Sequence, residues 1–310
     1  MDRAPRTVTV TADRSEARAG LGFGVAAYGL WGLLPIYFKL LSAVPAVAIV
    51  AHRIVWSMVA LLVLVLATGA AKEIATAVRH GPTLRLLLLT SVLIAINWLI
   101  YVYAVNSGHI LAGSLGYYLN PLANILLGRF VLKEPLGRMQ WAAVAIAGAG
   151  IAVLAAGALS HLWISLTLCC SFALYGLLRK IAKVDAIAGL TIETTVLLPL
   201  AVGWLAFTSG GPQPVWGTNA TELALLIFAG VASTTPLLLF TAAARRLRYS
   251  TLGVLQFLAP TLQFLMAVFL YGEPFGQAQA IAFAAIWTAA TLYLISSLRS
   301  ARTHAEMLPE

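Results

Sequence analysis

The sequence predicts an all-α integral membrane protein with ten transmembrane helices, built as two inverted five-helix repeats with both termini in the cytoplasm. Three observations support this fold class: the composition, a series of ten apolar segments, and an internal repeat. The 310 residues are 61% apolar and 10% charged, whereas soluble chains average about 45–50% apolar and about 25% charged residues. A mean hydropathy of +0.90 agrees, so the composition excludes an ordinary soluble enzyme.

Ten apolar segments are each long enough to cross a membrane. A helix rises about 1.5 Å per residue, so about 20 mostly apolar residues are needed to cross about 30 Å of hydrocarbon. The predicted spans are Gly20–Leu41, Ala46–Thr68, Leu84–Val105, Ile110–Val131, Met139–Ala158, Leu162–Ala182, Ile187–Phe207, Leu223–Ala244, Ser250–Tyr271 and Gln277–Leu298.

The basic residues predict the orientation of these spans. Cytoplasmic loops collect Lys and Arg because positive segments resist translocation. With the N-terminus inside, every Lys and Arg except Lys39 and Arg53 falls on or beside an inside segment. Residues 1–19, which lack the features of a signal peptide, and residues 299–310 are predicted cytoplasmic tails, the first of them disordered. The net charge of +9 therefore indicates topology, and we expect no nucleic-acid partner.

Two parts of the chain match at a constant separation. Leu119–Gln140 aligns with Leu258–Gln279. We therefore predict a first five-helix repeat over residues 20–158 and a second over residues 159–298. Because five is odd, the second repeat must cross the membrane upside down. Inverted repeats are typical of alternating-access transporters, whose substrate site lies between the halves; a duplication kept only for packing is the alternative.

Four ionisable residues lie inside predicted spans: Lys39, His52, Arg53 and Glu193. A charged side chain in hydrocarbon costs at least about 2.5–3.5 kcal/mol, so each is a candidate for the substrate pathway. Each also has another interpretation. Lys39 could extend to the outer headgroups, Arg53 could clamp backbone carbonyls, and His52 could either carry a proton or only pack. Glu193 could titrate during transport or pair with a basic residue at the inner edge.

The predicted outer half of the bundle contains two cations and no nearby acid. If both Lys39 and Arg53 face the interior, the outer cavity is positive and favours a carboxylate or another anionic or zwitterionic group.

Neutral polar and aromatic residues share helix faces with these candidates. Aromatic rings could stack on a ligand or belong to the belts at the membrane surfaces. Pro121 and Pro260 are related by the repeat, and we predict that they break their helices at a central site. The remaining predicted pathway residues are Trp56, Asn97, Trp98, Tyr101, Tyr117, Asn120 and Gln256.

Several motifs are similar to those of one transporter family. They include Tyr28-Gly-Leu-Trp31, Ala51-His52-Arg53, Asn97-Trp98, Ser114-Leu-Gly116-Tyr117-Tyr-Leu-Asn120-Pro121 and Tyr175-Gly-Leu-Leu-Arg179-Lys180. On these motifs, the chain resembles the RarD proteins, an EamA-type branch of the drug/metabolite transporter superfamily, from about Gly20 to Leu298. The resemblance implies two EamA-like repeats, a bacterial cytoplasmic membrane, and export of small organic solutes such as chloramphenicol-type drugs or amino-acid-like metabolites. One departure concerns Ala48, where the family pattern has a glutamate. Without that acid, a proton-carrying Glu–His or Glu–Arg pair is less favoured at this site.

These observations lead to a secondary active transporter with alternating access. We expect a small-molecule substrate, membrane lipid as the surroundings, protons as a coupling ion, and no cofactor; close-packed small residues could also form a homo-oligomer contact. The adjacent Cys169 and Cys170 have no metal-ligand spacing, and no span has the paired acids or histidines of a membrane enzyme. A channel-like pore or a non-transporting scaffold is the remaining alternative.

Overall fold

The described part of the chain is helical throughout. The computed structural model describes residues 8–131, 133, 136–157, 159–182, 184–247 and 255–306, and no strand occurs among them. The helices are α1 (Val8–Lys39), α2 (Ala46–Thr68), α3 (Ala71–Arg79), α4 (Gly81–Asn106), α5 (Ile110–Phe130), α6 (Arg138–Gly157), α7 (Leu159–Ile181), α8 (Ala186–Thr208), α9 (Ala220–Arg246), α11 (Leu258–Leu265), the π-helix η1 (Met266–Leu270) and α12 (Gln277–Glu306).

Seven helices are long and apolar enough over their described residues to cross a membrane. They are α1 from Arg18 onward, α2, α4, α5, α7, α8 and α9 through Ala243. The other three predicted spans correspond to α6, to α12, and to the shorter apolar segment Leu258–Leu270. The chain is therefore a multi-pass membrane protein.

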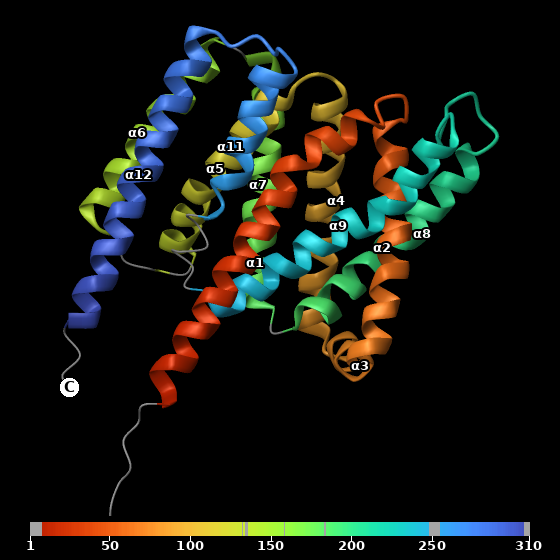
Figure 1. Cartoon of the computed structure of the whole chain (residues 1–310), viewed down its shortest axis with the longest axis horizontal. Coiled ribbons are helices and arrows are strands. Elements are labelled where there is room, and N and C mark those ends of the chain that lie inside the picture. Colours follow the sequence, from red (N-terminus) through yellow and green to blue (C-terminus); the bar gives the residue numbers. More distant parts are fainter. Residues whose placement is uncertain are drawn as a thin grey trace, which may run out of the picture.

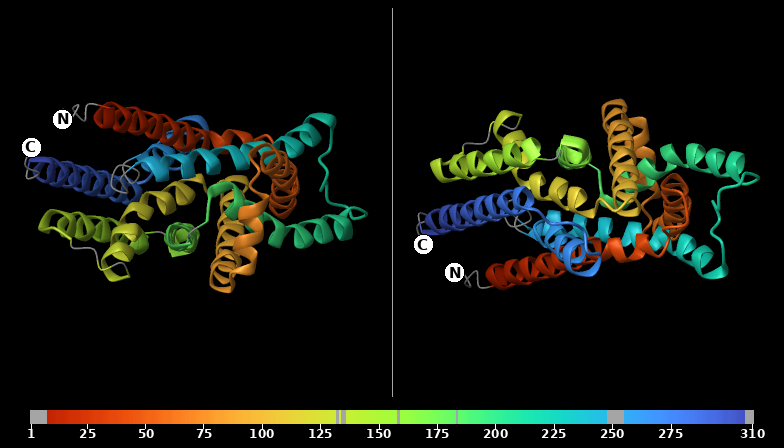
Figure 2. Two further views of the ribbon diagram at one scale, coloured as in Figure 1. Left: turned by 90° about the horizontal axis from the view of Figure 1, so that it is seen from below. Right: turned by 90° about the horizontal axis from the view of Figure 1, so that it is seen from above.

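The contacts between helices divide the molecule into a central group and one pair of helices toward each edge. α6 packs mainly on α12 at one edge of the molecule, and α2 packs on α8 toward the other (Figure 1). Between them, α1 packs on α9 and α11, and α7 packs on α4 and α5. Figure 2 shows from two further sides that both ends of the chain lie on the same side of the molecule.

Four connections lie at one end of the molecule, the upper end in Figure 1: those between α1 and α2, α4 and α5, α8 and α9, and η1 and α12. There, Glu273 accepts from the backbone N–H groups of Ile110 and Leu111 at 2.8 Å each, which caps the first turn of α5. The Nζ atom of Lys39 lies 5.6 Å from the ring centroid of Tyr271. Burial raises the pKa of Glu273, although its two N–H donors and the charge of Lys39 act in the opposite direction.

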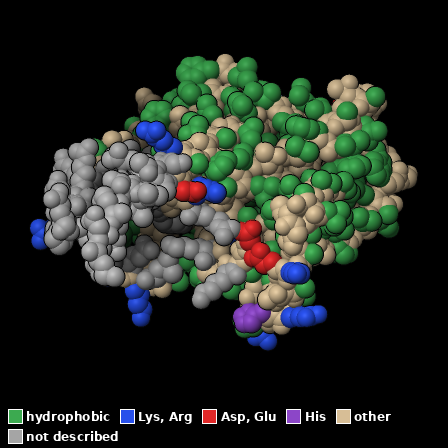
Figure 3. Space-filling view, turned by 60° about the horizontal axis from the view of Figure 1, so that its bottom comes forward, with side chains coloured by type: hydrophobic (Ala, Val, Ile, Leu, Met, Phe, Trp, Pro, Cys, Tyr) green, Lys and Arg blue, Asp and Glu red, His purple; other side chains and the backbone are tan. Residues whose placement is uncertain are grey.

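The opposite end contains α3 and many of the basic side chains. In Figure 3, which turns the lower end of Figure 1 forward, Lys and Arg side chains project around this end, whereas hydrophobic side chains cover much of the visible flank. Glu73 in α3 accepts from the backbone N–H of Asp185 at 2.6 Å, so α3 is held against the start of α8. Three apolar side chains, Ala77, Leu87 and Ile192, form a small buried cluster where α3, α4 and α8 meet.

Three features of the fold differ from the sequence predictions. α1 begins at Val8, so residues 8–19 are helical rather than disordered; no Gly or Pro interrupts this segment, and Ala, Arg and Glu favour a helix. The segment between the second and third predicted spans contains a further helix, α3. α5 continues from Ile110 to Phe130 through Pro121, so the predicted break at this proline is wrong. Neighbouring helices cover Pro121, and such surroundings allow a helix to tolerate proline at membrane depth.

The second repeat-related proline lies beside an interruption. A turn at Gln256 and Phe257 precedes α11, in which Pro260 is the third residue. Proline has no N–H, so Pro260 cannot donate to the carbonyl of Gln256, four residues earlier. The following π-helical turn, Met266–Leu270, further separates this segment from a regular spanning helix.

Candidate functional site

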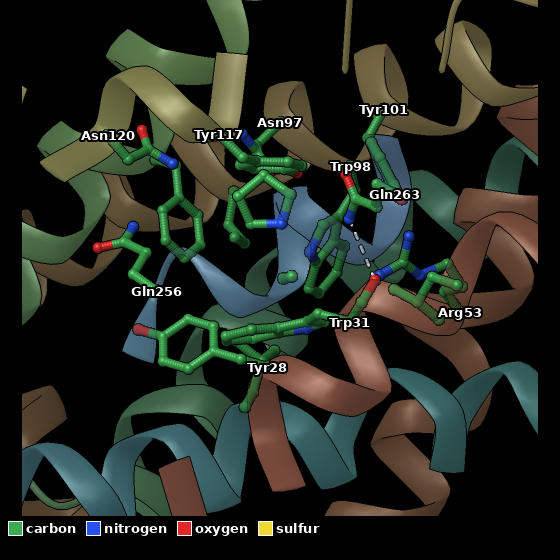
Figure 4. A pocket seen from close by; sticks show the side chains of 16 residues that line it. Tyr28, Trp31, Arg53, Asn97, Trp98, Tyr101, Tyr117, Asn120, Gln256 and Gln263 are labelled. Atoms are coloured by element: carbon green, nitrogen blue, oxygen red, sulfur yellow. Dashed lines mark hydrogen bonds between the residues drawn. The ribbon is translucent and has the colours of Figure 1, made fainter. Parts of the chain in front are cut away.

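A central cavity lies between α1, α2, α4, α5, α7, α9, the turn before α11, and α11 itself (Figure 4). The space not filled by atoms is about 540 Å³, a figure that includes the part open to the surroundings. Aromatic rings supply much of its wall, from Trp31, Trp98 and Phe172. Its polar lining residues are Tyr28, Arg53, Asn97, Tyr101, Tyr117, Asn120, Gln256 and Gln263.

Arg53 is the only charged residue among the described residues that line this cavity. Its side chain is 3% exposed, and its Nε donates to the Oγ of Ser233 in α9 at 2.8 Å. Its guanidinium carbon lies 4.7 Å from the ring centroid of Trp98. The Nη1 atom is buried without a hydrogen-bond partner. The cation is therefore held by one hydroxyl and by aromatic faces, and it keeps a free donor.

The contact between α2 and α9 places Ser233 beside Arg53. The main chain of Trp56 occupies the space that a Cβ at Gly230 would fill. The Oγ of Ser57 also donates to the carbonyl of Gly230 at 3.3 Å. Glycine at this position allows the two backbones to approach closely, as is common where membrane helices cross.

The far end of the cavity carries amide groups. Figure 4 shows Asn120 and Gln256 at the end opposite Arg53. Asn120 is fully buried, and neither its Nδ2 nor its Oδ1 has a hydrogen-bond partner. Gln256 accepts from the Nδ2 of Asn124 at 3.4 Å. Buried amides are almost always paired in native proteins, so the unpaired amide of Asn120 is unusual.

Asn97, by contrast, is fully engaged. Its Nδ2 donates to the carbonyl of Leu168 at 3.1 Å and to the Oγ of Ser171 at 3.0 Å. Its Oδ1 accepts from the hydroxyl of Tyr117 at 3.0 Å. Asn97 therefore ties α4 to α7 and orients the ring of Tyr117 in the cavity wall.

A proline in α1 creates another polar contact at the cavity. Pro35 has no N–H, so the carbonyl of Trp31 four residues earlier loses its helical partner. The Nε2 of Gln263 donates to this carbonyl at 3.1 Å, as the dashed line in Figure 4 shows. The Oε1 of Gln263 is buried and unpaired. The freed carbonyl of Trp31 thus joins α1 to α11, and the Oε1 of Gln263 remains as an acceptor at the cavity.

The structure brings most of the predicted pathway residues to this cavity and places five elsewhere. Those that line it are Arg53, Asn97, Trp98, Tyr101, Tyr117, Asn120, Gln256 and Pro260. Those that do not are Lys39, His52, Trp56, Glu193 and Pro121. Whether the first group forms a transport pathway stays a prediction.

The ionisable residues outside the cavity have separate surroundings. Lys39 lies over Tyr271 at the upper end. The Nε2 of fully buried His52 lies 2.9 Å from the carbonyl of Val215, and its ring is 4.9 Å from that of Trp216. His52 therefore packs the α8–α9 connection against α2. Glu193 lies in its own cluster with Thr90, Tyr175 and Arg179.

Sequence reasoning missed several residues of the site. Tyr28 and Phe172 line the cavity, and Ser233 orients Arg53. Pro35 was a usable signal for the contact that Gln263 makes. A proline inside a helix leaves the carbonyl four residues earlier, here that of Trp31, without its helical donor, and this carbonyl then needs a donor from another helix. No such signal identifies Ser233, since its partner lies 180 residues away.

Known proteins resemble this chain over nearly its full length. The model of the EamA-like transporter family matches residues 18–156. A protein of Pseudomonas aeruginosa named an uncharacterized transporter is 47% identical over 295 residues, which cover 93% of this chain and 97% of that protein. Protein RarD of Escherichia coli K12 is 42% identical over 298 residues, 94% of this chain and 98% of that protein.

This chain belongs to the RarD family. As an EamA-type RarD protein, it is a membrane transporter, and its family is a transporter family rather than an enzyme family. A solved crystal structure adds support for the fold alone, with a TM-score of 0.62 at 21% identity over 90% of this chain and 98% of that one. Another RarD relative, from Pseudomonas aeruginosa, is named chloramphenicol-sensitive protein RarD and is 34% identical over 92% of this chain and 97% of that protein.

Proposed function

We propose that this RarD-family chain is a secondary active transporter that carries small organic solutes with an acidic head group and an apolar body. The observation that carries the proposal is the unpaired Nη1 of Arg53 in an aromatic cavity. Among the described residues, no carboxylate lies within ion-pair distance of Arg53. A substrate carboxylate would supply that missing partner, because arginine binds carboxylates through directed N–H donors.

The remaining parts of the cavity suit the rest of such a solute. Trp31, Trp98 and Phe172 offer faces for an apolar or aromatic body. The unpaired amide of Asn120, at the end opposite Arg53, offers both a donor and an acceptor. Amino-acid-like metabolites carry the carboxylate that Arg53 would bind, whereas chloramphenicol-type drugs combine an aromatic ring with neutral polar groups. One relative's name refers to chloramphenicol sensitivity.

We further propose that the molecule consists of two inverted five-helix halves that alternate access to this cavity. The helix contacts support this arrangement. If each spanning helix is exchanged for the one five spans away, the contact of α1 with α9 becomes that of α7 with α4. The contact of α1 with α11 likewise becomes that of α7 with α5. The pairs α2–α8, α5–α11 and α6–α12 are unchanged by the exchange.

The proposed orientation places α3 and both termini in the bacterial cytoplasm. Its support is the group of Lys and Arg side chains around that end in Figure 3, since cytoplasmic segments collect these residues. We also propose that the transporter exports its solutes and uses the proton gradient.

Counterflow in vesicles tests the proposal against a channel or a scaffold. Purified protein is reconstituted in lipid vesicles loaded with unlabelled benzoate, and labelled benzoate is added outside. A carrier gives saturable uptake with a transient overshoot, and ATP is not needed. A pore conducts without saturation or overshoot, a scaffold moves nothing, and either result contradicts the proposal. Labelled chloramphenicol in parallel vesicles tests the neutral drug class.

A further inference from the structure

A second buried charge occupies the position in α8 that Arg53 occupies in α2. Both helices are 23 residues long, and both charges lie seven residues after the first residue of the helix. Arg53 is 3% exposed and Glu193 is 1% exposed. Arg53 faces the central cavity, but Glu193 does not line it. The two matching helices thus carry opposite charges at the same distance from their first residues. Glu193 has no role in the site described above.

Glu193 has three partners, all from other helices. The Oγ1 of Thr90 in α4 donates to Oε1 at 2.6 Å, and the hydroxyl of Tyr175 in α7 donates to Oε2 at 3.3 Å. The Nε of Arg179, also in α7, lies 3.7 Å from Oε1, which is beyond hydrogen-bond distance. The Nη1 of Arg179 is buried and has no hydrogen-bond partner.

This geometry leaves the carboxylate only partly compensated. An ionised carboxylate can accept about four hydrogen bonds, whereas Glu193 accepts two and has a long ion pair. Burying a charge stabilises a fold only when its partners are close and well aligned. A proton on Glu193 would remove the buried charge, and both hydroxyl partners can rotate to accept from the new O–H.

The surroundings separate Glu193 from the cytoplasmic side while leaving Arg179 partly accessible. The apolar cluster of Ala77, Leu87 and Ile192 lies next to the acid, and Ile192 precedes it in the chain. α3 contributes Ala77, and the bond from Asp185 N–H to Glu73 holds α3 in place. The Arg179 side chain is 12% exposed, against 1% for Glu193. A proton on the acid therefore has its exit toward the α3 side, which opens when the apolar cluster or Arg179 moves.

We propose that Glu193 is the proton-binding group of the transport cycle and that Arg179 is its positioning partner. In the outward-open state Glu193 takes one proton, the carboxylate becomes a carboxylic acid, and the ion pair that joins α8 to α7 is released. In the inward-open state the proton leaves to the water phase on the α3 side, and the ion pair forms again. Among the described residues, the titratable or charged groups facing Glu193 are Tyr175 and Arg179, both from α7. α4 contributes the neutral Thr90, and α2, α3 and α9 contribute no charged contact. The inference rests on the proposed proton-driven function.

A titration of the protein without substrate tests proton binding directly. Full-length protein in lipid nanodiscs is titrated while the infrared C=O band of protonated carboxyl groups is recorded. The wild type is expected to gain a buried carboxylic-acid band as the pH falls. Glu193→Gln should lack this band, and Glu273→Gln should retain it. Arg179→Gln should move the band's titration to higher pH, because loss of the cation favours the neutral acid. An unchanged band in Glu193→Gln, or an unchanged titration in Arg179→Gln, overturns the proposal.

A transport measurement tests the coupling separately. Vesicles with wild-type protein and an acidic interior are expected to accumulate benzoate against the passive distribution of benzoic acid, which favours the alkaline side. Glu193→Gln should exchange benzoate but lose this gradient-driven accumulation. Accumulation retained by Glu193→Gln overturns the coupling role. If no variant transports benzoate while the Glu193 band titrates as expected, the proposed substrate class fails and the proton site stands. Thermal unfolding of each variant in the same lipid confirms that the fold persists.

Discussion

The Nε of Arg53 donates to the Oγ of Ser233 at 2.8 Å across 180 residues of sequence. This bond joins α2 to α9 and fixes the direction of the guanidinium group. The Oγ of Ser233 itself donates to the carbonyl of Ala229 at 2.7 Å, so both hydrogen-bonding roles of the hydroxyl are used. Arg53 is therefore oriented by a side chain whose own geometry is fixed by its helix.

Removal of this hydroxyl should weaken transport without abolishing it. Ser233→Ala leaves the Nε of Arg53 without its acceptor, and an unmet buried donor costs about 1–3 kcal/mol. This cost should lower the unfolding temperature, and the half-saturating benzoate concentration should rise because the guanidinium group loses the contact that fixes its direction. Thr288→Val is the control, because its exposed hydroxyl makes the same kind of helical bond, to Ala284. An equal loss in both variants would contradict the role of Ser233.

Asn120 and Asn97 should respond oppositely when each is replaced by Leu. Neither amide atom of Asn120 has a partner, so Asn120→Leu should retain or raise the unfolding temperature. It should weaken transport of 4-hydroxybenzoate, which carries a polar group opposite its carboxylate, more than that of benzoate. Asn97 has three hydrogen-bond partners, so Asn97→Leu should lower the stability by about 1–3 kcal/mol for the donors and acceptors that it leaves unpaired. Thermal unfolding and vesicle uptake, measured on both variants, check this. Destabilisation by Asn120→Leu would show that its amide is already engaged.

A methyl group at Gly189 should disturb the Glu193 cluster. A Cβ there would overlap the guanidinium of Arg179, so Gly189→Ala should displace Arg179 and weaken its ion pair with Glu193. Overpacking of this kind typically costs about 1–3 kcal/mol. Gly203→Ala in the same helix is the control, because a Cβ there meets nothing within 4 Å. Similar unfolding temperatures for the two variants would contradict the close approach of Arg179 to α8.

Acid should destabilise the contact between the α4–α5 connection and α7. Burial and the ring of His161, whose centroid is 4.0 Å away, lower the pKa of His109 below its ordinary value. The neutral form of His109 is therefore favoured by the fold. Its contribution to stability is present above the ordinary pKa near 6.5 and is lost as the pH falls through the lowered value.

The measurement is thermal unfolding at about pH 8 and about pH 5, the range that brackets the titration of histidine. The drop in unfolding temperature between these values should be smaller in His161→Gln than in the wild type, because the variant removes one of the groups that lower the pKa of His109. An equal drop in both proteins would show that the histidine pair does not contribute.

Polar residues within apolar segments were the most informative sequence signal for the site. Arg53, Asn120 and Gln256 are conspicuous because hydrocarbon excludes such groups unless protein covers them. Their convergence on one cavity depends on contacts between distant helices. His52 had the same signal but packs against Val215 and Trp216, since sequence alone does not show which side of a helix faces the cavity.

Proline was a less reliable signal. The same residue type lies in a continuous helix at Pro121 and beside a helix interruption at Pro260. At Pro35, its main effect is to free the carbonyl that Gln263 then binds. A proline removes one hydrogen bond in each case, but the surrounding helices determine whether the backbone bends, breaks or finds another donor. Those helices are not identified by local sequence.

The most direct measurement of the central claim compares two probes of similar size and opposite charge. Initial uptake of labelled benzoate and labelled benzylamine is measured in vesicles that contain wild-type protein, Arg53→Lys or Arg53→Gln. The wild type should favour benzoate at least about tenfold, which corresponds to about 1.4 kcal/mol. Arg53→Lys should retain part of this preference, and Arg53→Gln should lose it while its unfolding temperature still shows a folded protein. A wild type that favours benzylamine, or an Arg53→Gln variant with the full preference for benzoate, would contradict the assignment of Arg53 to the substrate's acidic group.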